Sequence, residues 1–212
     1  MLPTALFDLF NSITPMSPQL EEKLLKLLKE RRVRKKTILL NADSVCNHMY
    51  FIVQGLFRGY HTIVDFKKKK DVDVCTWFMQ ERDILISPYS FFARQPSYES
   101  IQALEDSVVF YLTYDELQGL YTQFPEFNLI ARVLTEKYHL QSDIRLYHIR
   151  MRPASDRYMY FEKYHLDLIN RLTRDQVASY LDMSRESLHK VRAFLRDERN
   201  KANQEYLERQ AE

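Results

Sequence analysis

The spacing of hydrophobic residues divides the sequence into a helical start, a β-rich middle and a helical end. Apolar residues three or four positions apart predict helices over residues 6–13 and 18–30. Residues 37–112 consist of short runs rich in β-branched and aromatic side chains, separated by polar or glycine-bearing turns. Helical spacing returns after Pro125. Several short strands at this spacing predict a small antiparallel barrel or roll between helical segments.

A long helix is predicted over residues 126–150. The tripeptide Met151-Arg152-Pro153 should end it, because proline lacks a backbone donor and restricts the residue before it. We therefore expect a hinge between domains at this tripeptide. The residues at helical spacing near one stripe of this helix are Ile130, Leu134, Tyr138, Gln141 and Arg145, and Ile144 flanks them.

Residues 172–195 predict two short helices joined by a tight turn, the helix-turn-helix arrangement. Thr173 is a good N-cap, and Gln176 at the third helical position completes a capping box, so a helix should begin directly after Thr173. Asp182 interrupts the apolar spacing, and Ser184 offers an N-cap for a second helix.

The second helix should bury Leu188, Val191 and Leu195 and direct its polar residues outward. The outward residues are Arg185, Glu186, His189, Lys190 and Arg192. Arginine can pair with guanine in the major groove, and glutamate can accept a hydrogen bond from cytosine, so this face suits DNA. An ordinary α-hairpin would show the same apolar spacing, and it remains the alternative.

The openings of both helices resemble the CRP/FNR family of bacterial transcription regulators. The residues that carry the resemblance are Leu172-Thr173-Arg174 and Ser184-Arg185-Glu186-Ser187. It implies phosphate contacts from Thr173, Arg174 and Ser184 and base contacts from Arg185, Glu186 and Lys190, with His189 on the same face. The turn departs from the family pattern, which has glycine where this sequence has Asp182. Aspartate tolerates the left-handed conformation better than most residues, so the turn should survive.

The resemblance extends to the β-rich region. Residues 50–58 resemble the hairpin of the family's cyclic-nucleotide-binding roll, with Gly55 at the turn, and residues 84–103 occupy the place of its phosphate-binding cassette. A cyclic nucleotide needs a Gly-Glu step there and an arginine followed by serine or threonine. This sequence has Ile86-Ser87 and Ser97-Tyr98 at those places. A buried phosphate would therefore lack its bidentate arginine partner.

Arg94 lies near the cassette and could substitute for the missing arginine. The candidate ligand-pocket residues are then Ser87, Arg94, Ser97 and Tyr98. The cassette segment also resembles CRP-like regulators from Bacteroidetes, whose effectors are generally not established. We therefore expect a degenerate sensor that does not bind cyclic AMP and whose effector is unknown.

The resemblance covers nearly the whole chain and implies an α+β fold in three parts. An antiparallel β-roll sensor domain of the cyclic-nucleotide-binding, jelly-roll type, with flanking helices, would cover residues 1–125. A dimerisation helix would cover residues 126–150, and a helix-turn-helix domain residues 151–212. The dimer contacts would come from Ile130, Leu134, Tyr138, Gln141 and Ile144. The alternative is a helix that packs on its own domain.

In this family a wing of two short strands usually follows the second helix of the helix-turn-helix. Residues 196–212 are instead strongly charged and contain no β-branched residue. This composition favours a helix extension or a frayed tail. We therefore expect the wing to be reduced or absent, and its phosphate contacts to be lost with it.

The composition of the chain further limits the functions that are expected. The net charge of the 212 residues is only +2, so nucleic-acid binding must depend on a local face, such as residues 185–196 with four cations and one glutamate. The four lysines at 67–70 suit solubility, with a partner-binding patch as the alternative. Cys46 and Cys75 lie far apart, so neither an iron–sulfur cluster nor a metal site is expected. The absence of a signal peptide and of a long apolar run predicts a cytoplasmic protein without membrane insertion.

These features predict a homodimeric transcription regulator that binds a palindromic site on double-stranded DNA. If it is an activator, RNA polymerase is a further partner. A small-ligand-binding sensor with a vestigial DNA-binding domain is the alternative. An enzyme is not expected, because the sequence has no recognisable catalytic triad, carboxylate pair or metal cluster.

Overall fold

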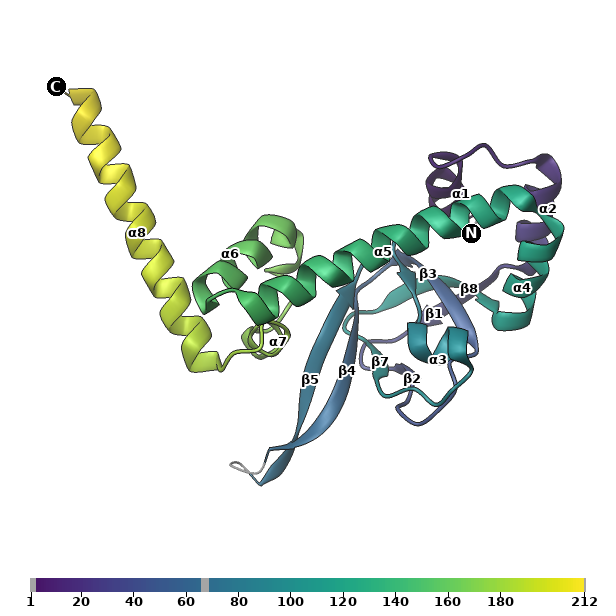
Figure 1. Ribbon diagram of the computed structural model, residues 1–212, viewed down its shortest axis with the longest axis horizontal. Helices are drawn as coiled ribbons and strands as arrows, with labels where there is room; N and C mark the ends of the chain where they lie inside the picture. The colour runs from purple at the N-terminus through teal and green to yellow at the C-terminus, as the bar shows by residue number, and fades with distance from the viewer. Residues whose placement is uncertain (1–2, 66–68, 212) are drawn as a thin grey trace. The chain divides into compact units, whose positions relative to one another are not determined.

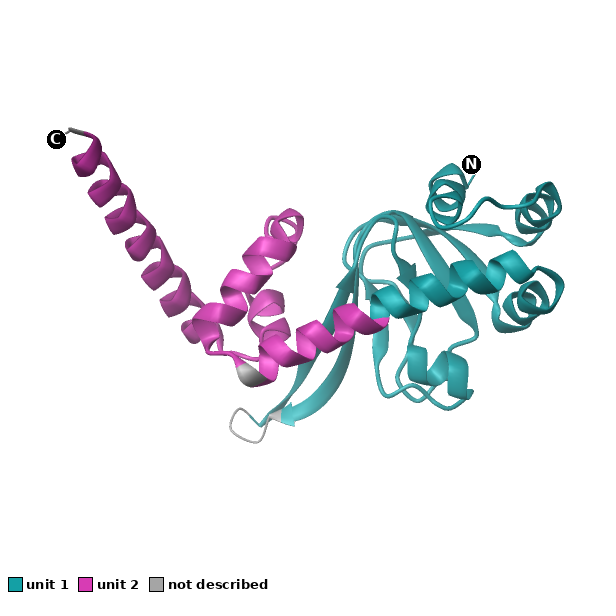
Figure 2. Cartoon of the chain, turned by 45° about the horizontal axis from the view of Figure 1, so that its top comes forward, with its two compact units in different colours: residues 1–138 teal, residues 139–212 magenta. Residues whose placement is uncertain are grey.

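The computed structural model describes residues 3–65 and 69–211 and contains two compact units. The first unit covers residues 1–138 and the second residues 139–212 (Figure 2). The boundary between these units lies inside the long helix α5 (Pro125–Met151). This helix ends at Met151, as predicted, and the hinge at Met151-Arg152-Pro153 stays a prediction. In the described part of the chain, no helix is both long and apolar enough to cross a membrane.

The first unit is built on two four-stranded antiparallel sheets, as the β-rich middle of the sequence predicts (Figure 1). One sheet has the strand order β1-β8-β3-β6 and the other β2-β7-β4-β5. The strands are β1 (Lys29–Val33), β2 (Ile38–Leu40), β3 (His48–Gln54), β4 (Phe57–Asp65), β5 (Lys70–Met79), β6 (Ile84–Leu85), β7 (Ser100–Ala103) and β8 (Ser107–Thr113). Lys67 and Lys68 of the lysine run lie outside the described residues, whereas Lys69 and Lys70 are exposed.

Two glycines allow close packing inside the roll. Gly55 joins β3 to β4 with a φ of +117°, and a Cβ there would lie 2.0 Å from the Ser107 hydroxyl. A Cβ at Gly59 would lie 2.1 Å from the indole of Trp77. The turn predicted at Gly55 is therefore confirmed, and the absence of a side chain at Gly59 leaves room for the ring of Trp77, its cross-strand partner.

Helices cover one end of the roll. They are α1 (Thr4–Asn11), α2 (Pro18–Leu27), α4 (Tyr114–Gln123) and the first part of α5, with α3 (Pro88–Ala93) between β6 and β7 (Figure 1). The α2 helix ends at Leu27, earlier than its apolar spacing suggests, because β1 begins at Lys29. The rings of Phe10 and Phe127 meet edge to face with centroids 5.9 Å apart, which joins α1 to α5 in one core.

The second unit is all helical through residue 211. After the end of α5 come α6 (Ala154–Tyr164), the short 3-10 helix η1 (Leu166–Leu168), α7 (Arg174–Tyr180) and α8 (Arg185–Ala211). Over residues 139–211 no strand follows the second helix of the helix-turn-helix, so the expected loss of the wing is confirmed. A helix of 27 residues takes its place.

Candidate functional site

The first helix of the helix-turn-helix begins as its sequence predicts. The Thr173 hydroxyl accepts a hydrogen bond from the Gln176 N–H at 3.2 Å, and the Gln176 side chain accepts one from the Thr173 N–H at 2.8 Å. This capping box starts α7 at Arg174. Both Thr173 and Arg174 are exposed, so they are accessible to a ligand.

The turn between α7 and α8 depends on Asp182. This residue has a φ of +52°, the left-handed conformation that was expected at the position where the family has glycine. The N–H of Met183 donates to the Ala178 carbonyl at 3.0 Å and closes the turn. Ala178 is buried, which lets the two helices approach closely.

The second helix is capped by Ser184, whose hydroxyl accepts a hydrogen bond from the Ser187 N–H at 3.0 Å. Leu188 and Leu195 are buried and anchor α8 in the small core of the second unit. The other buried residues of that core are Tyr158, Phe161, Leu168, Val177, Ala178, Tyr180 and Leu181. The apolar spacing of the sequence thus correctly identifies the buried side of α8.

The opening of α8 presents a polar face. The exposed residues there are Ser184, Arg185, Glu186, His189 and Lys190. The Arg185 guanidinium lies 3.7 Å from the Asp175 carboxylate, and both side chains are largely exposed. An exposed ion pair of this kind contributes at most about 1 kcal/mol, so Arg185 is free to exchange Asp175 for another partner.

The interior of the roll contains only part of the predicted ligand pocket. The Ser87 and Ser97 hydroxyls are buried and lie 3.0 Å apart. They adjoin a residue that sequence reasoning missed, Glu99, of which only 2% is exposed. Its carboxylate accepts hydrogen bonds from the Trp77 indole N–H at 2.9 Å and the Thr76 hydroxyl at 3.1 Å. Burial raises the pKa of Glu99 above its usual value, against the opposing effect of these donors.

Arg94 is occupied by structural contacts. Its guanidinium donates to the Cys46 carbonyl at 2.8 Å and to the Asn47 side chain at 2.5 Å, and it lies 4.3 Å from the centroid of the Tyr114 ring. To bind a phosphate it would have to give up these partners. The idea that Arg94 replaces the missing cassette arginine therefore has no support in this geometry.

Tyr98, the fourth candidate pocket residue, is 59% exposed and lies beside Tyr89 with ring centroids 5.7 Å apart. A separate hollow of about 240 Å³ lies elsewhere in the roll. It is lined by Leu39, Leu40, Asn41, Ser44, Val45, Cys46, Asn47, His48, Tyr50 and Ile101. None of the four candidate pocket residues lines this hollow. In the described residues no group of three or more metal-ligating side chains is found.

The predicted dimer stripe of α5 falls largely on the side that packs against the roll. Ile130 has no exposed surface and Leu134 is 8% exposed, and both belong to the roll's core. The Tyr138 hydroxyl accepts a hydrogen bond from the Ile84 N–H at 2.7 Å, and burial raises the pKa of Tyr138. Ile130 and Leu134 therefore pack in the core of a single chain, which does not favour their predicted role as interface anchors. The dimer interface stays a prediction. Gln141 and Ile144 are exposed.

Another side of α5 carries an exposed apolar stripe. Its most exposed members are Leu129, Leu140, Ile144 and Tyr147, spaced so that they recur on one side of a helix. Leu140 is 60% exposed. Apolar residues at such spacing are typical of a helix that pairs with another helix.

Comparisons with known proteins agree with this architecture. Residues 30–124 match the family model of the cyclic nucleotide-binding domain. A solved structure described as a transcriptional regulator of the CRP/FNR family, from Eubacterium rectale, has a TM-score of 0.65 at 15% identity, covering 91% of this chain and 88% of that one. The chain has the fold of the CRP/FNR transcription regulators. The match to the cyclic nucleotide-binding domain covers most of the roll and α4.

Two further CRP/FNR-like structures are similar over most of their length. FixK2 from Bradyrhizobium japonicum has a TM-score of 0.63 at 15% identity, covering 81% of this chain and 86% of that one. The c-di-GMP-responsive global regulator CLP from Xanthomonas campestris has a TM-score of 0.66 at 14% identity, covering 86% and 93%. A comparison with the curated proteins found no match. At these identities the structural likeness establishes the fold, and function has to be argued from the residues.

Proposed function

We propose that this protein is a homodimeric transcription regulator that binds a specific, palindromic DNA sequence in the cytoplasm. The observation that carries the proposal is the exposed opening of α8, where Arg185 and Glu186 directly follow the Ser184 cap. A recognition helix reads bases with the residues of its first turns, which point most directly into the major groove. Arg185 and Glu186 have the side chains that pair with guanine and cytosine.

Phosphate contacts would come from Thr173, Arg174 and Ser184 at the two helix openings. Backbone N–H groups at helix N-termini add favourable contacts to phosphate. Lys190 and His189 lie on the same exposed face of α8 and would extend the contact along the groove. These contacts position the protein on the duplex, whereas base contacts specify the sequence.

Dimerisation would use the exposed stripe of α5 that contains Leu140 and Ile144. Two copies related by a two-fold axis would place their recognition helices in successive major grooves, about 34 Å apart. This symmetry is the reason to expect a palindromic site. RNA polymerase would be a further partner if the regulator is an activator.

The roll is proposed to act without cyclic AMP. Arg94 is held by Cys46, Asn47 and Tyr114, and the buried carboxylate of Glu99 lies beside Ser87 in the cassette. A cyclic nucleotide would bring a phosphate charge next to that carboxylate, without an arginine to pair with it.

Selection of bound sites from random double-stranded DNA tests the proposal. We expect enrichment of a palindrome whose half-sites are separated by about one helical turn. Failure to enrich any sequence at low salt, with the folded dimer present, would contradict it. The 240 Å³ hollow then favours the second candidate, a small-ligand sensor whose helix-turn-helix is vestigial. Saturable binding of a small molecule in that hollow, without DNA binding, would support this candidate.

A further inference from the structure

A hollow of about 360 Å³ lies in the second unit between α6, the start of α7 and the first half of α8. It is lined by Tyr158, Glu162, Arg174, Arg185, Leu188, His189, Arg192, Ala193, Leu195, Arg196 and Arg199. Five of these residues are arginines and one is a carboxylate. The hollow therefore carries a strong positive charge, although the whole chain has a net charge of only +2.

The arginines gather there because of their spacing on α8. Arg185, Arg192, Arg196 and Arg199 are separated by seven, four and three positions, which places them on one side of the helix. Arg174 joins them from the start of α7. Like charges held this close repel one another, so an anion bound among them would be stabilised.

The positive charge is only partly neutralised inside the unit. Arg199 forms an ion pair with Glu162, and Arg185 lies 3.7 Å from Asp175, which does not line the hollow. Arg192 lies over the Tyr158 ring, 5.9 Å from its centroid. Within residues 139–211, neither Arg192 nor Arg174 has an ion-pair partner.

We infer that this hollow binds a phosphate group, and that the group belongs to the DNA backbone beside the recognition helix. Guanidinium groups bind phosphate oxygens in a bidentate manner, which suits a cluster of arginines better than a cluster of lysines. Arg174 and Arg185 border the hollow and also stand at the two helix openings proposed to face DNA. The hollow thus lies next to the proposed DNA-binding surface.

The inference rests on the proposed function and extends it. Residues 196–211 continue α8 and form no wing, so phosphate contacts from wing strands are not available. The arginines of α8 would supply contacts of the same kind from a helix. A phosphorylated small molecule presents the same phosphate chemistry as the DNA backbone, and the experiment below distinguishes these two sources.

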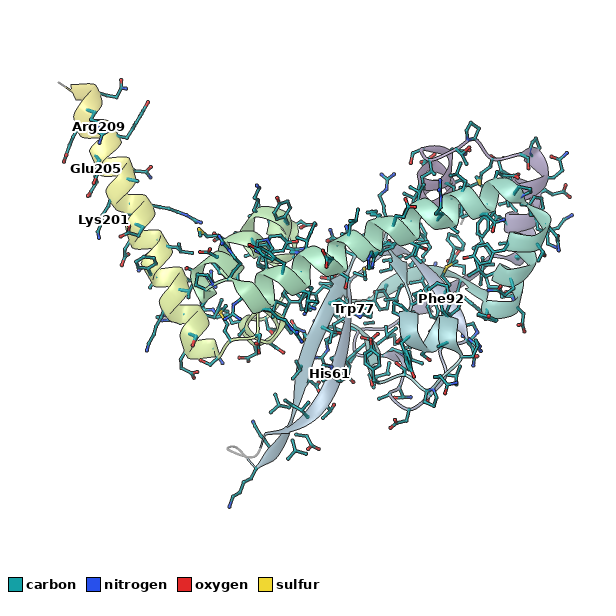
Figure 3. All side chains as sticks on the ribbon, viewed as in Figure 1. His61, Trp77, Phe92, Lys201, Glu205 and Arg209 are labelled. Atoms are coloured by element: carbon teal, nitrogen blue, oxygen red, sulfur yellow. The ribbon has the colours of Figure 1, made fainter. Side chains whose placement is uncertain are left out.

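The test compares Arg192→Ala with Arg209→Ala. Both remove one positive charge from an exposed position of α8, but Arg209 lies near its far end and does not line the hollow (Figure 3). Binding is measured by fluorescence anisotropy on the selected duplex and on an unrelated duplex, at several salt concentrations. Helix content by circular dichroism checks that both variants are folded.

We expect Arg192→Ala to weaken binding to both duplexes by about tenfold, the loss of one charge-assisted hydrogen bond. The dependence of the affinity on salt concentration should become weaker, by the amount expected for the loss of about one phosphate contact. The base preferences should stay the same. Arg209→Ala should bind as the unmodified protein does. Equal binding by the two variants would overturn the inference.

Calorimetric titration with inorganic pyrophosphate, without DNA, separates the two phosphate sources. Saturable binding that Arg192→Ala abolishes, with DNA binding unaffected, would assign the site to a free anion and overturn the DNA assignment. If the unmodified chain binds no DNA, the proposed function fails, and the titration still decides the phosphate site. Saturable pyrophosphate binding would then support the site, and its absence would overturn it.

Discussion

The indole N–H of Trp77 lies 2.9 Å from a carboxylate oxygen of Glu99 inside the roll. Trp77 lies in β5, and Glu99 directly precedes β7, a strand that β4 separates from β5 in the same sheet. The Thr76 hydroxyl donates to the same carboxylate oxygen at 3.1 Å. Glu99 is almost fully buried, so its charge is separated from water. A buried carboxylate is stabilised by hydrogen bonds such as those from Trp77 and Thr76, and it repels a second anion that enters the roll.

Stability should depend on pH through Glu99. Burial raises the pKa of Glu99 in the folded state, so the folded protein takes up this proton more readily than the unfolded chain. The resulting stabilisation is present at low pH and is lost as pH rises through the folded-state pKa. Urea unfolding of the protein and of Glu99→Gln, from pH 5 to pH 8, should show the variant gaining in relative stability as pH rises. A difference in stability between the protein and Glu99→Gln that does not change with pH would contradict this prediction. Glu205→Gln, on the exposed end of α8, is the control.

Cyclic AMP and cyclic GMP should bind more weakly than millimolar, if they bind at all. Arg94 would have to leave the Cys46 carbonyl and the Tyr114 ring before it could pair with a phosphate. Isothermal titration of the folded protein with each nucleotide provides the measurement. Stoichiometric binding at micromolar concentration would show that the roll rearranges to expose an arginine, contrary to this prediction.

The dimer should depend on Leu140 and not on Leu134. Leu134 is buried in the roll, so a charge there would disrupt the core of a single chain and could not report on assembly. Leu140→Glu places the charge on the exposed stripe, and sedimentation should then show a monomer. Leu25→Glu, at an exposed leucine of α2, is the matched control and should remain dimeric. A tight dimer of Leu140→Glu would place the interface elsewhere.

The turn of the helix-turn-helix should be sensitive to the residue at 182. Asp182 has a positive φ, a conformation that costs an alanine more than an aspartate and costs glycine nothing. We expect Asp182→Ala to lower the free energy of unfolding by about 1 kcal/mol and Asp182→Gly to leave it unchanged or raise it. Urea unfolding measures both. If alanine proved as stable as aspartate, the strain assigned to this turn would be absent.

The parts of the structure that could be predicted are those fixed by near neighbours in the sequence. The caps at Thr173 and Ser184 and the turn at Asp182 each depend on contacts within about five residues, so the sequence shows them directly. Whether a leucine of α5 is buried or exposed depends on tertiary packing. Leu134 and Leu140 have the same chemistry and lie on different sides of α5, but only the packing of α5 on the roll determines that the side with Leu134 is buried and the side with Leu140 is exposed.

Glu99 was missed for the same reason. A single glutamate in a polar segment is typical of a solvent-facing position, because charged residues are rarely buried. Its burial depends on Trp77, which lies 22 positions away in the sequence. The contacts of Arg94 could not be predicted either, because its nearness to the cassette in sequence does not show that its guanidinium faces Asn47 and Tyr114.

If α8 reads the bases, Arg185→Ala and Arg174→Ala should change DNA binding in different ways. Arg185 should pair with a guanine, so its loss should cost roughly 1–3 kcal/mol on the selected site and relax the preference at that base pair. Glu186→Ala should likewise relax the preference at a cytosine. Arg174, at the start of α7, should hold a phosphate. Its loss should weaken binding to all sequences alike and reduce the salt dependence by about one contact.

Binding measured on the selected site and on its single-base variants, at several salt concentrations, separates these effects. In the free protein Arg185 forms an exposed ion pair with Asp175, and replacing it by alanine should therefore cost little stability. A change in binding by Arg185→Ala then reports on the contact with DNA. Asp175→Ala is the matched control, because it frees Arg185 and should leave base preferences intact. If Arg185→Ala weakens binding to every DNA sequence equally and leaves the base preferences unchanged, then α8 contacts the DNA backbone and another element reads the bases.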